Sequence, residues 1–261
     1  MAVKEAITAT LKETVNLYKF SFKVCFVFSL ALSILTEYFK IYAINLGLYD
    51  ALKQYFESGD IPEHFQNNTL LGFLGILSIV ATIVVYGLLV CLGEMQFKNK
   101  TDAIKKVQIY KALSIFKGRF WPFLGVFFIS VILSGLAGFL GVIGIWLITS
   151  FSFIVFPLIL LSNLGVLQTY KRTFVVMGKN AVYALQVGFI AVILLGMKYL
   201  IYFIFITIND YDNIHFGIEH AVMVFIEALT LPFVTMLMIS VYHRLSDNGA
   251  VLLKDETPEH R

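Results

Sequence analysis

The chain has 261 residues and a mean hydropathy of +0.82; 59% of its residues are apolar and only 14% are charged. A soluble globular domain is about a quarter charged, so this composition excludes a chain covered by water on all sides. The net charge of +3 is too small to indicate a nucleic-acid partner. The apolar runs are continuous and do not alternate, which predicts an all-α integral membrane protein.

Six stretches are long enough to cross a membrane, because a helix needs roughly 20 apolar residues to span the hydrocarbon. The predicted spans are about 20–41, 70–93, 120–139, 142–164, 181–206 and 218–241. The third and fourth should form a tight hairpin, since no charge occurs between Phe120 and Tyr170. The glycines that mark its turn are Gly135, Gly138, Gly141 and Gly144. We expect a single polytopic membrane domain over residues 1–261.

The distribution of charge predicts the orientation. With six spans both termini lie on one side, and that side holds 17 of the 20 Lys and Arg residues. The two long opposite loops hold only Lys40 and Lys53, together with eight acidic residues. Cytoplasmic loops of membrane proteins carry the excess of Lys and Arg. We therefore expect both termini in the cytoplasm. The opposite loop 42–69 is amphipathic enough for a short helix, with Leu52 and Phe56 reaching the headgroups.

Three basic amphipathic segments precede the hairpins and are predicted at about 5–19, 101–117 and 166–178. The second contains YKALSIFKGR and the third YKRTFVVMGK, about sixty residues later. In the second, Ile109, Ala112, Leu113 and Phe116 follow the spacing of one helix face; a matching stripe in the third is shifted by 61 residues. Gly118 and Gly178 are expected to end these helices.

The stripe of the third segment comprises Leu167, Tyr170, Phe174 and Met177. The fold class we predict is therefore three repeats, each a cytoplasmic in-plane helix followed by a two-span hairpin.

These segments predict contact with membrane phospholipid, because basic residues near the surface attract anionic headgroups. The residues expected at the headgroups are Lys105, Lys106, Lys111, Lys117, Arg119, Lys171, Arg172 and Lys179. The alternative is that they only anchor the topology, as bases beside membrane spans do in general.

The block IVFPLILLSNLGVLQTYKRTFVVMGKNAVYAL (Ile154–Leu185) resembles the signature region of the YciC family of bacterial inner-membrane proteins. It is also similar, more distantly, to the membrane region of some glycerophosphodiester phosphodiesterases. The matching residues are Pro157, Gly165, Lys171, Arg172, Thr173 and Lys179–Asn180, and NLYKFSFKVCFVFSLALSIL is similar too. The loop at 42–69 and the Tyr-rich repeats depart from the family. The resemblance implies a bacterial inner-membrane location and this fold, and no activity.

Charged residues inside spans are costly and are candidates for function. Lys198 in the fifth span and Glu227 in the sixth lie at similar depth, so we expect them to form an ion pair. That pair would be structural or would couple protons or substrate. Pro157 and Pro232 inside spans are expected to kink their helices. Glu37 and Glu94 at span ends are interpreted as interfacial caps.

The motifs of catalysis are missing from the sequence. It contains no phosphate-binding loop, no nucleophile elbow and no pair of histidines at metal-ligand spacing. We expect no catalytic residue, no metal site and no cofactor. The leading hypothesis is a non-enzymatic membrane protein that binds lipid or supports envelope homeostasis. The alternatives are a small transporter or channel that uses the Lys198 and Glu227 region, and an intramembrane lipid enzyme.

Overall fold

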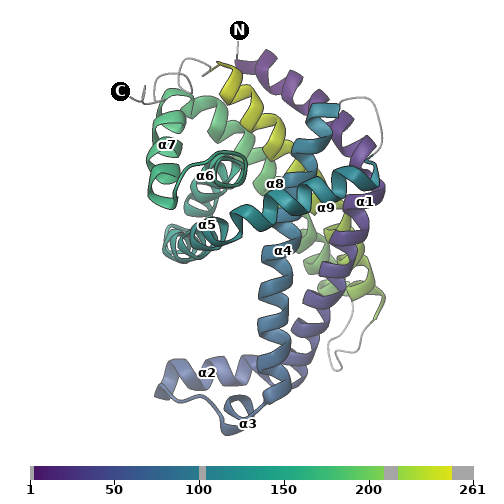
Figure 1. Ribbon diagram of the computed structural model, residues 1–261. Coiled ribbons are helices and arrows are strands. Elements are labelled where there is room, and N and C mark those ends of the chain that lie inside the picture. Colours follow the sequence, from purple (N-terminus) through teal and green to yellow (C-terminus); the bar gives the residue numbers. More distant parts are fainter. Residues whose placement is uncertain (1–2, 100–103, 209–216, 249–261) are drawn as a thin grey trace. The chain divides into compact units, whose positions relative to one another are not determined.

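The computed structural model describes residues 3–99, 104–208 and 217–248, and every regular element in this part of the chain is an α-helix (Figure 1). The helices are α1 (Val3–Asn45), α2 (Leu48–Ser58), α3 (Glu63–Gln66), α4 (Thr69–Asn99), α5 (Lys106–Gly138), α6 (Gly141–Leu161), α7 (Val166–Lys179), α8 (Ala181–Ile208) and α9 (Ile218–Asn248). The all-α prediction is confirmed. The start of the predicted segment 101–117, most of the loop between the fifth and sixth predicted spans, and the tail after residue 248 lie outside the described residues.

The long helices have the length and composition of membrane spans. Helices α1, α4, α5, α6 and α9 could each cross a membrane, and a sixth crossing is reached if α7 and residues 181–197 of α8 count as one bent span. Many large apolar side chains stay exposed on these helices, including Ile76 at 66% and Ile132 at 63%, and Phe139 in the turn after α5 is 90% exposed. A soluble protein rarely exposes such continuous apolar surface. The structure thus supports a helical, membrane-spanning chain.

Two of the three predicted in-plane helices do not exist as separate elements. Residues 5–19 belong to the continuous 43-residue helix α1, and residues 106–117 belong to the continuous 33-residue helix α5. The expected helix end at Gly118 is therefore wrong. A glycine inside a helix costs only about 1 kcal/mol, which does not outweigh the backbone hydrogen bonds that continue on both sides.

The third predicted in-plane helix is separate. Helix α7 is bent by 103° from the first part of α8. Asn180 makes this bend, because its side-chain amide donates to the Val176 carbonyl at 3.0 Å while its own carbonyl accepts the first bond of α8 from Ala184. The end of α7 at Lys179 agrees with the predicted break at Gly178 to within one residue.

The hairpin of α5 and α6 turns at the predicted glycines. Gly141 has φ +61, which is left-handed backbone that residues with a side chain rarely adopt. A Cβ at Gly144 would overlap the Ala137 carbonyl across the turn. The two helices pack along each other, and α7 packs mainly on α6 (Figure 1).

The chain forms two compact units. Unit 1 comprises Met1–Cys25, Tyr86–Leu195 and Pro232–Arg261; unit 2 comprises Phe26–Val85 and Gly196–Leu231. The core of unit 1 brings α4 and α9 together, since a Cβ at Gly93 would lie 2.9 Å from Ile239 Cγ1. Aromatic rings join α5 and α6, with the Phe123 and Phe156 centroids 5.8 Å apart.

Unit 2 contains the predicted outer loop. The loop forms a helix as expected, α2, which is followed by the short α3 (Figure 1). Leu52 is 44% and Phe56 is 82% exposed, so both are free to reach headgroups. Tyr42 Oη lies 3.4 Å from Asn68 Oδ1 and Phe39 contacts the open face of Gly75, and these two contacts hold α1 against α4 within this unit.

Candidate functional site

Six of the eight residues predicted at headgroups are exposed in the structure. They are Lys105, Lys106, Lys111, Lys117, Lys171 and Lys179. All six belong to unit 1, either on α7 or on the first part of α5 and the residue before it. We call these six lysines the basic layer. Arg119 and Arg172 are only partly exposed.

The outward side of α7 combines lysines with large apolar groups. Leu167 is 69%, Phe174 65% and Val175 50% exposed, and Lys171 and Lys179 are exposed on the same helix. An amphipathic helix with exposed apolar groups and lysines is suited to the interface between headgroups and acyl chains. The prediction that Leu167, Tyr170, Phe174 and Met177 form one apolar stripe is only partly right, because just Tyr170 among them is buried.

The inward side of α7 is polar and is held by hydroxyl groups. Tyr170 Oη donates to the Val126 carbonyl at 3.1 Å and lies 3.1 Å from Ser130 Oγ. Thr169 and Thr173 are fully buried, and each hydroxyl donates to a carbonyl one turn earlier in the helix. Because the hydroxyl groups are satisfied inside the protein, the apolar side chains of α7 remain outside. The periodicity of apolar residues could not show that the protein-facing side of α7 is the polar one.

The first turns of α5 repeat the start of α7 at a distance of 60 residues. The Gln108 side chain accepts a hydrogen bond from the Lys105 backbone N–H at 2.6 Å, and Gln168 accepts from Gly165 at 3.3 Å. The buried face of α5 here is Gln108, Ala112 and Phe116. Leu113, which the sequence pattern placed on that face, is 47% exposed.

Arg119 has a structural role in addition to its charge. Its Nε donates to the Ile159 carbonyl at 3.0 Å, and an Nη donates to the Leu164 carbonyl. These carbonyls belong to the end of α6 and the segment after it, where helical hydrogen bonds run out. The guanidinium therefore ties α5 to α6, and less of it is available to a lipid.

A polar recess lies beside Arg119 and was not foreseen. It has a volume of about 380 Å³, and its polar lining is Glu94, Lys98, Ser114, Arg119, Ser162 and Asn163. Glu94 is buried and accepts from Lys98 at 2.9 Å and from His243 at 2.5 Å. The His243 ring stacks on Phe97 with centroids 3.7 Å apart. Glu94 is therefore a buried ion-pair residue rather than the expected interfacial cap.

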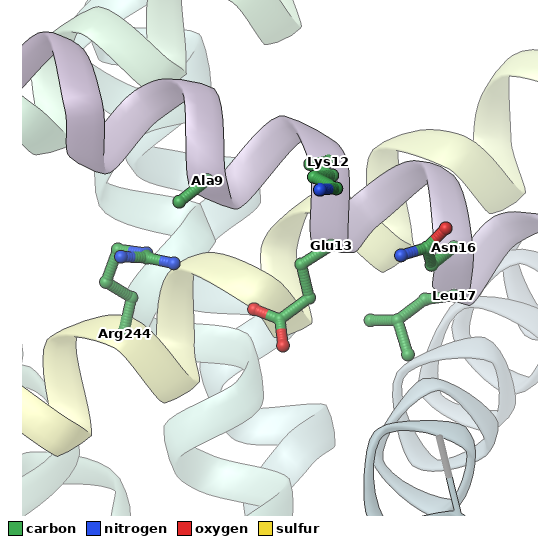
Figure 2. A pocket seen from close by; sticks show the side chains of 6 residues that line it. All are labelled: Ala9, Lys12, Glu13, Asn16, Leu17 and Arg244. Carbon is green, nitrogen blue, oxygen red and sulfur yellow. The ribbon is translucent and has the colours of Figure 1, made fainter. Parts of the chain in front are cut away.

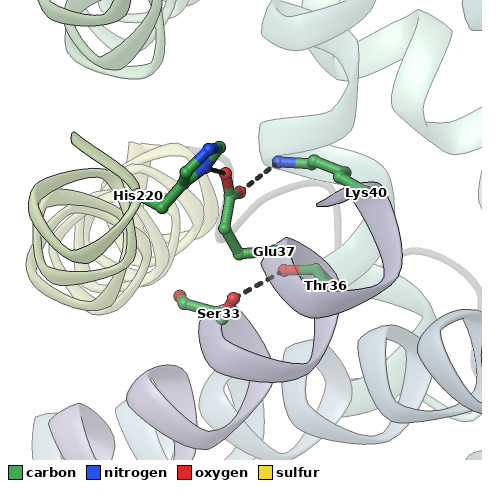
Figure 3. Close-up of polar contacts among 5 residues, drawn as sticks. All are labelled: Ser33, Thr36, Glu37, Lys40 and His220. Atoms are coloured by element: carbon green, nitrogen blue, oxygen red, sulfur yellow. Dashed lines mark hydrogen bonds and ion pairs between the residues drawn. The ribbon is translucent and has the colours of Figure 1, made fainter. Parts of the chain in front are cut away.

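A second pair of the same kind lies in unit 2 (Figure 3). The Glu37 carboxylate contacts His220 Nδ1 at 2.8 Å and Lys40 Nζ at 3.0 Å. Glu37 and His220 are both buried, while Lys40 is about half exposed. The interpretation of Glu37 as an interfacial cap is thus also wrong. The sequence did contain a signal for the two lysine contacts, because Glu37–Lys40 and Glu94–Lys98 are three and four residues apart and such residues meet on a helix.

The other predicted residues lie inside helices. Lys198 is in α8, and its side chain lies outside the described residues, so its pairing with Glu227 stays a prediction. Glu227 is partly buried in α9. Pro157 and Pro232 lie within α6 and α9, which continue through them as single helices.

No group of three or more His, Cys, Asp and Glu side chains is placed to hold a metal ion in the part of the chain that the structure describes. A scan against models of protein families, a search of curated proteins and a search of solved structures each found no match.

Proposed function

We propose that this chain is a non-enzymatic, multi-pass membrane protein that binds anionic phospholipid through its basic layer. The observation that carries the proposal is the outward side of α7, where exposed Leu167 and Phe174 accompany Lys171 and Lys179. The apolar groups would enter the acyl region while the lysines meet phosphate. From the distribution of Lys and Arg we place this layer at the cytoplasmic leaflet of a bacterial inner membrane.

The strength of such binding follows from the number of bases. Each Lys or Arg near an anionic surface contributes roughly 1 kcal/mol, so the six lysines of the layer provide a substantial attraction. Helix α7 fixes the position of Lys171 and Lys179, because Tyr170 holds its inward side.

The proposal predicts a specific loss in Lys171→Gln. Native mass spectrometry of the purified chain with added phosphatidylglycerol should show about fivefold weaker binding, since roughly 1 kcal/mol corresponds to that factor. Lys171→Arg should keep the affinity because it keeps the charge.

The matched control is Lys53→Gln, which removes an exposed lysine from α2. Asp50 and Glu57 lie one turn away on either side of Lys53 and offset its charge, so phosphatidylglycerol binding should not change. Equal weakening by both substitutions, or by neither, would contradict the proposal.

A further inference from the structure

A second recess in unit 1 brings an acid and two bases together. It lies between α1 and α9 and has a volume of about 270 Å³. Its lining residues are Ala9, Lys12, Glu13, Asn16, Leu17 and Arg244. None of these belongs to the basic layer.

The two central charges of this recess point toward the same space from different helices. Glu13 reaches into it from α1 and Arg244 from α9 (Figure 2). No ion pair joins them in the described part of the chain, and Arg244 Nε is enclosed by protein without a hydrogen-bond partner. A buried donor left without an acceptor is unfavourable. The recess therefore brings the Glu13 carboxylate and the Arg244 guanidinium together without an ion pair between them.

The recess lies at the predicted level of the headgroups. Asn16 and Leu17 come just before the first predicted span at residue 20, and Arg244 comes just after the last one ends at residue 241. Lys12 is exposed at its edge.

We propose that this recess binds the headgroup of a phospholipid that carries a primary amine. Arg244 and Lys12 would donate to the phosphate, and Glu13 and the Asn16 amide oxygen would accept from the ammonium. A purely anionic headgroup would be repelled by Glu13, and a quaternary amine has no N–H to donate. The inference rests on the membrane location in the proposed function but not on the lysines of the basic layer.

The test is native mass spectrometry of the full purified chain with equimolar phosphatidylethanolamine, phosphatidylcholine and phosphatidylglycerol. The parent should prefer phosphatidylethanolamine over phosphatidylcholine, and Glu13→Gln should lower that preference about tenfold, as one charge-assisted hydrogen bond is lost. Lys12→Gln, at an exposed position where folding is not at risk, should weaken binding of phosphatidylethanolamine. Arg244→Gln should weaken it further.

The chain contains its own matched control, because Lys4 and Glu5 repeat the Lys12 and Glu13 pair two turns earlier on α1 and are exposed outside the recess. The double variant Lys4→Gln/Glu5→Gln should keep the full preference. A parent that binds the three lipids equally, or an unchanged preference in Glu13→Gln, would overturn the proposal.

Two further measurements distinguish this inference from binding of a soluble ligand and from lipid binding by the basic layer. An excess of soluble glycerophosphoethanolamine should leave the bound lipid in place; displacement at equal concentration would assign the recess to a soluble ligand and overturn the proposal. Loss of phosphatidylglycerol binding in Lys171→Gln tests the basic layer alone, so either proposal can fail without the other.

Discussion

At the scale of single residues, two buried carboxylates each contact both a histidine and a lysine. Glu37 and Glu94 each meet a histidine of α9 and a lysine one turn along their own helix. An ionised carboxylate is costly to bury unless it is paired. These histidines therefore make it possible for the two acids to be buried near the ends of predicted spans, where the sequence alone indicated interfacial caps.

Substitution of His220 tests this role. His220→Leu should lower the stability of the chain by about 3 kcal/mol, because it leaves the Glu37 carboxylate buried with a single half-exposed partner. The double variant Glu37→Met/His220→Leu should recover most of the loss, since no carboxylate is then left buried without its histidine partner. The measurement is the apparent melting temperature of the purified chain in detergent.

Glu57→Gln on α2 is the control for that series, because Glu57 is exposed and should have almost no effect. If the losses in Glu37→Met and His220→Leu simply add in the double variant, the two side chains do not act as a pair.

At the scale of helices, close packing depends on certain glycines, and the sequence does not show which glycines lie at helix contacts. A Cβ at Gly87 of α4 would overlap the ring of Phe116 from α5, whereas a Cβ at Gly72 of the same helix meets nothing within 4 Å. Small residues at such contacts let transmembrane helices approach closely. Gly87 thus fixes where the start of α5 lies against α4 within unit 1.

The two glycines should respond in opposite directions to alanine. Gly87→Ala should destabilise the chain by about 1–3 kcal/mol, because the Phe116 ring must shift. Gly72→Ala should be neutral or stabilise by up to about 1 kcal/mol, because alanine is the better helix former. Thermal unfolding of both variants checks this, and a loss in Gly72→Ala equal to that in Gly87→Ala would refute the packing argument.

Helix α7 shows how much of an element the sequence predicts. Its existence, its end near Gly178 and its basic, amphipathic character follow from the residue pattern. Its orientation does not, because Tyr170 looks apolar in a periodicity count but uses its hydroxyl to bind Val126 and Ser130. In α1 and α5 the sequence predicts a helix break that does not occur. The change from polar to apolar residues is visible in the sequence, but the backbone stays helical through it.

At the scale of the whole molecule, the predicted inner ends of all six spans belong to unit 1. The described part of the first outer loop, with Lys53 and Glu57, belongs to unit 2. The turn between α5 and α6, predicted on the outer side, also belongs to unit 1. Unit 1 therefore contains chain segments predicted on both sides of the membrane, so the predicted orientation needs a direct test.

Single cysteines provide that test. The native Cys25 and Cys91 are fully buried and should react poorly. In intact cells a membrane-impermeant maleimide should label Lys53→Cys and should reach Lys171→Cys only after permeabilisation, because the excess of Lys and Arg predicts the second position in the cytoplasm. Labelling of Lys171→Cys in intact cells would reverse the orientation and place the basic layer outside.

The sequence by itself determined the class of this protein. Continuous apolar runs require helices, because a backbone in lipid must satisfy its own hydrogen bonds. Four of the six predicted spans fall wholly inside one observed helix, and the other two extend past the ends of α5 and α6 by one and three residues. The basic layer was equally visible, since lysines at the ends of apolar runs are a local pattern. The tertiary structure alone decided which distant residues meet.

The pairs Glu37–His220 and Glu94–His243 join positions 183 and 149 residues apart. The recess of Glu13 and Arg244 likewise needs the two ends of the chain in one unit. Such contacts follow from helix packing, which depends on side-chain shape and the satisfaction of buried polar groups, and neither leaves a periodic trace in one chain.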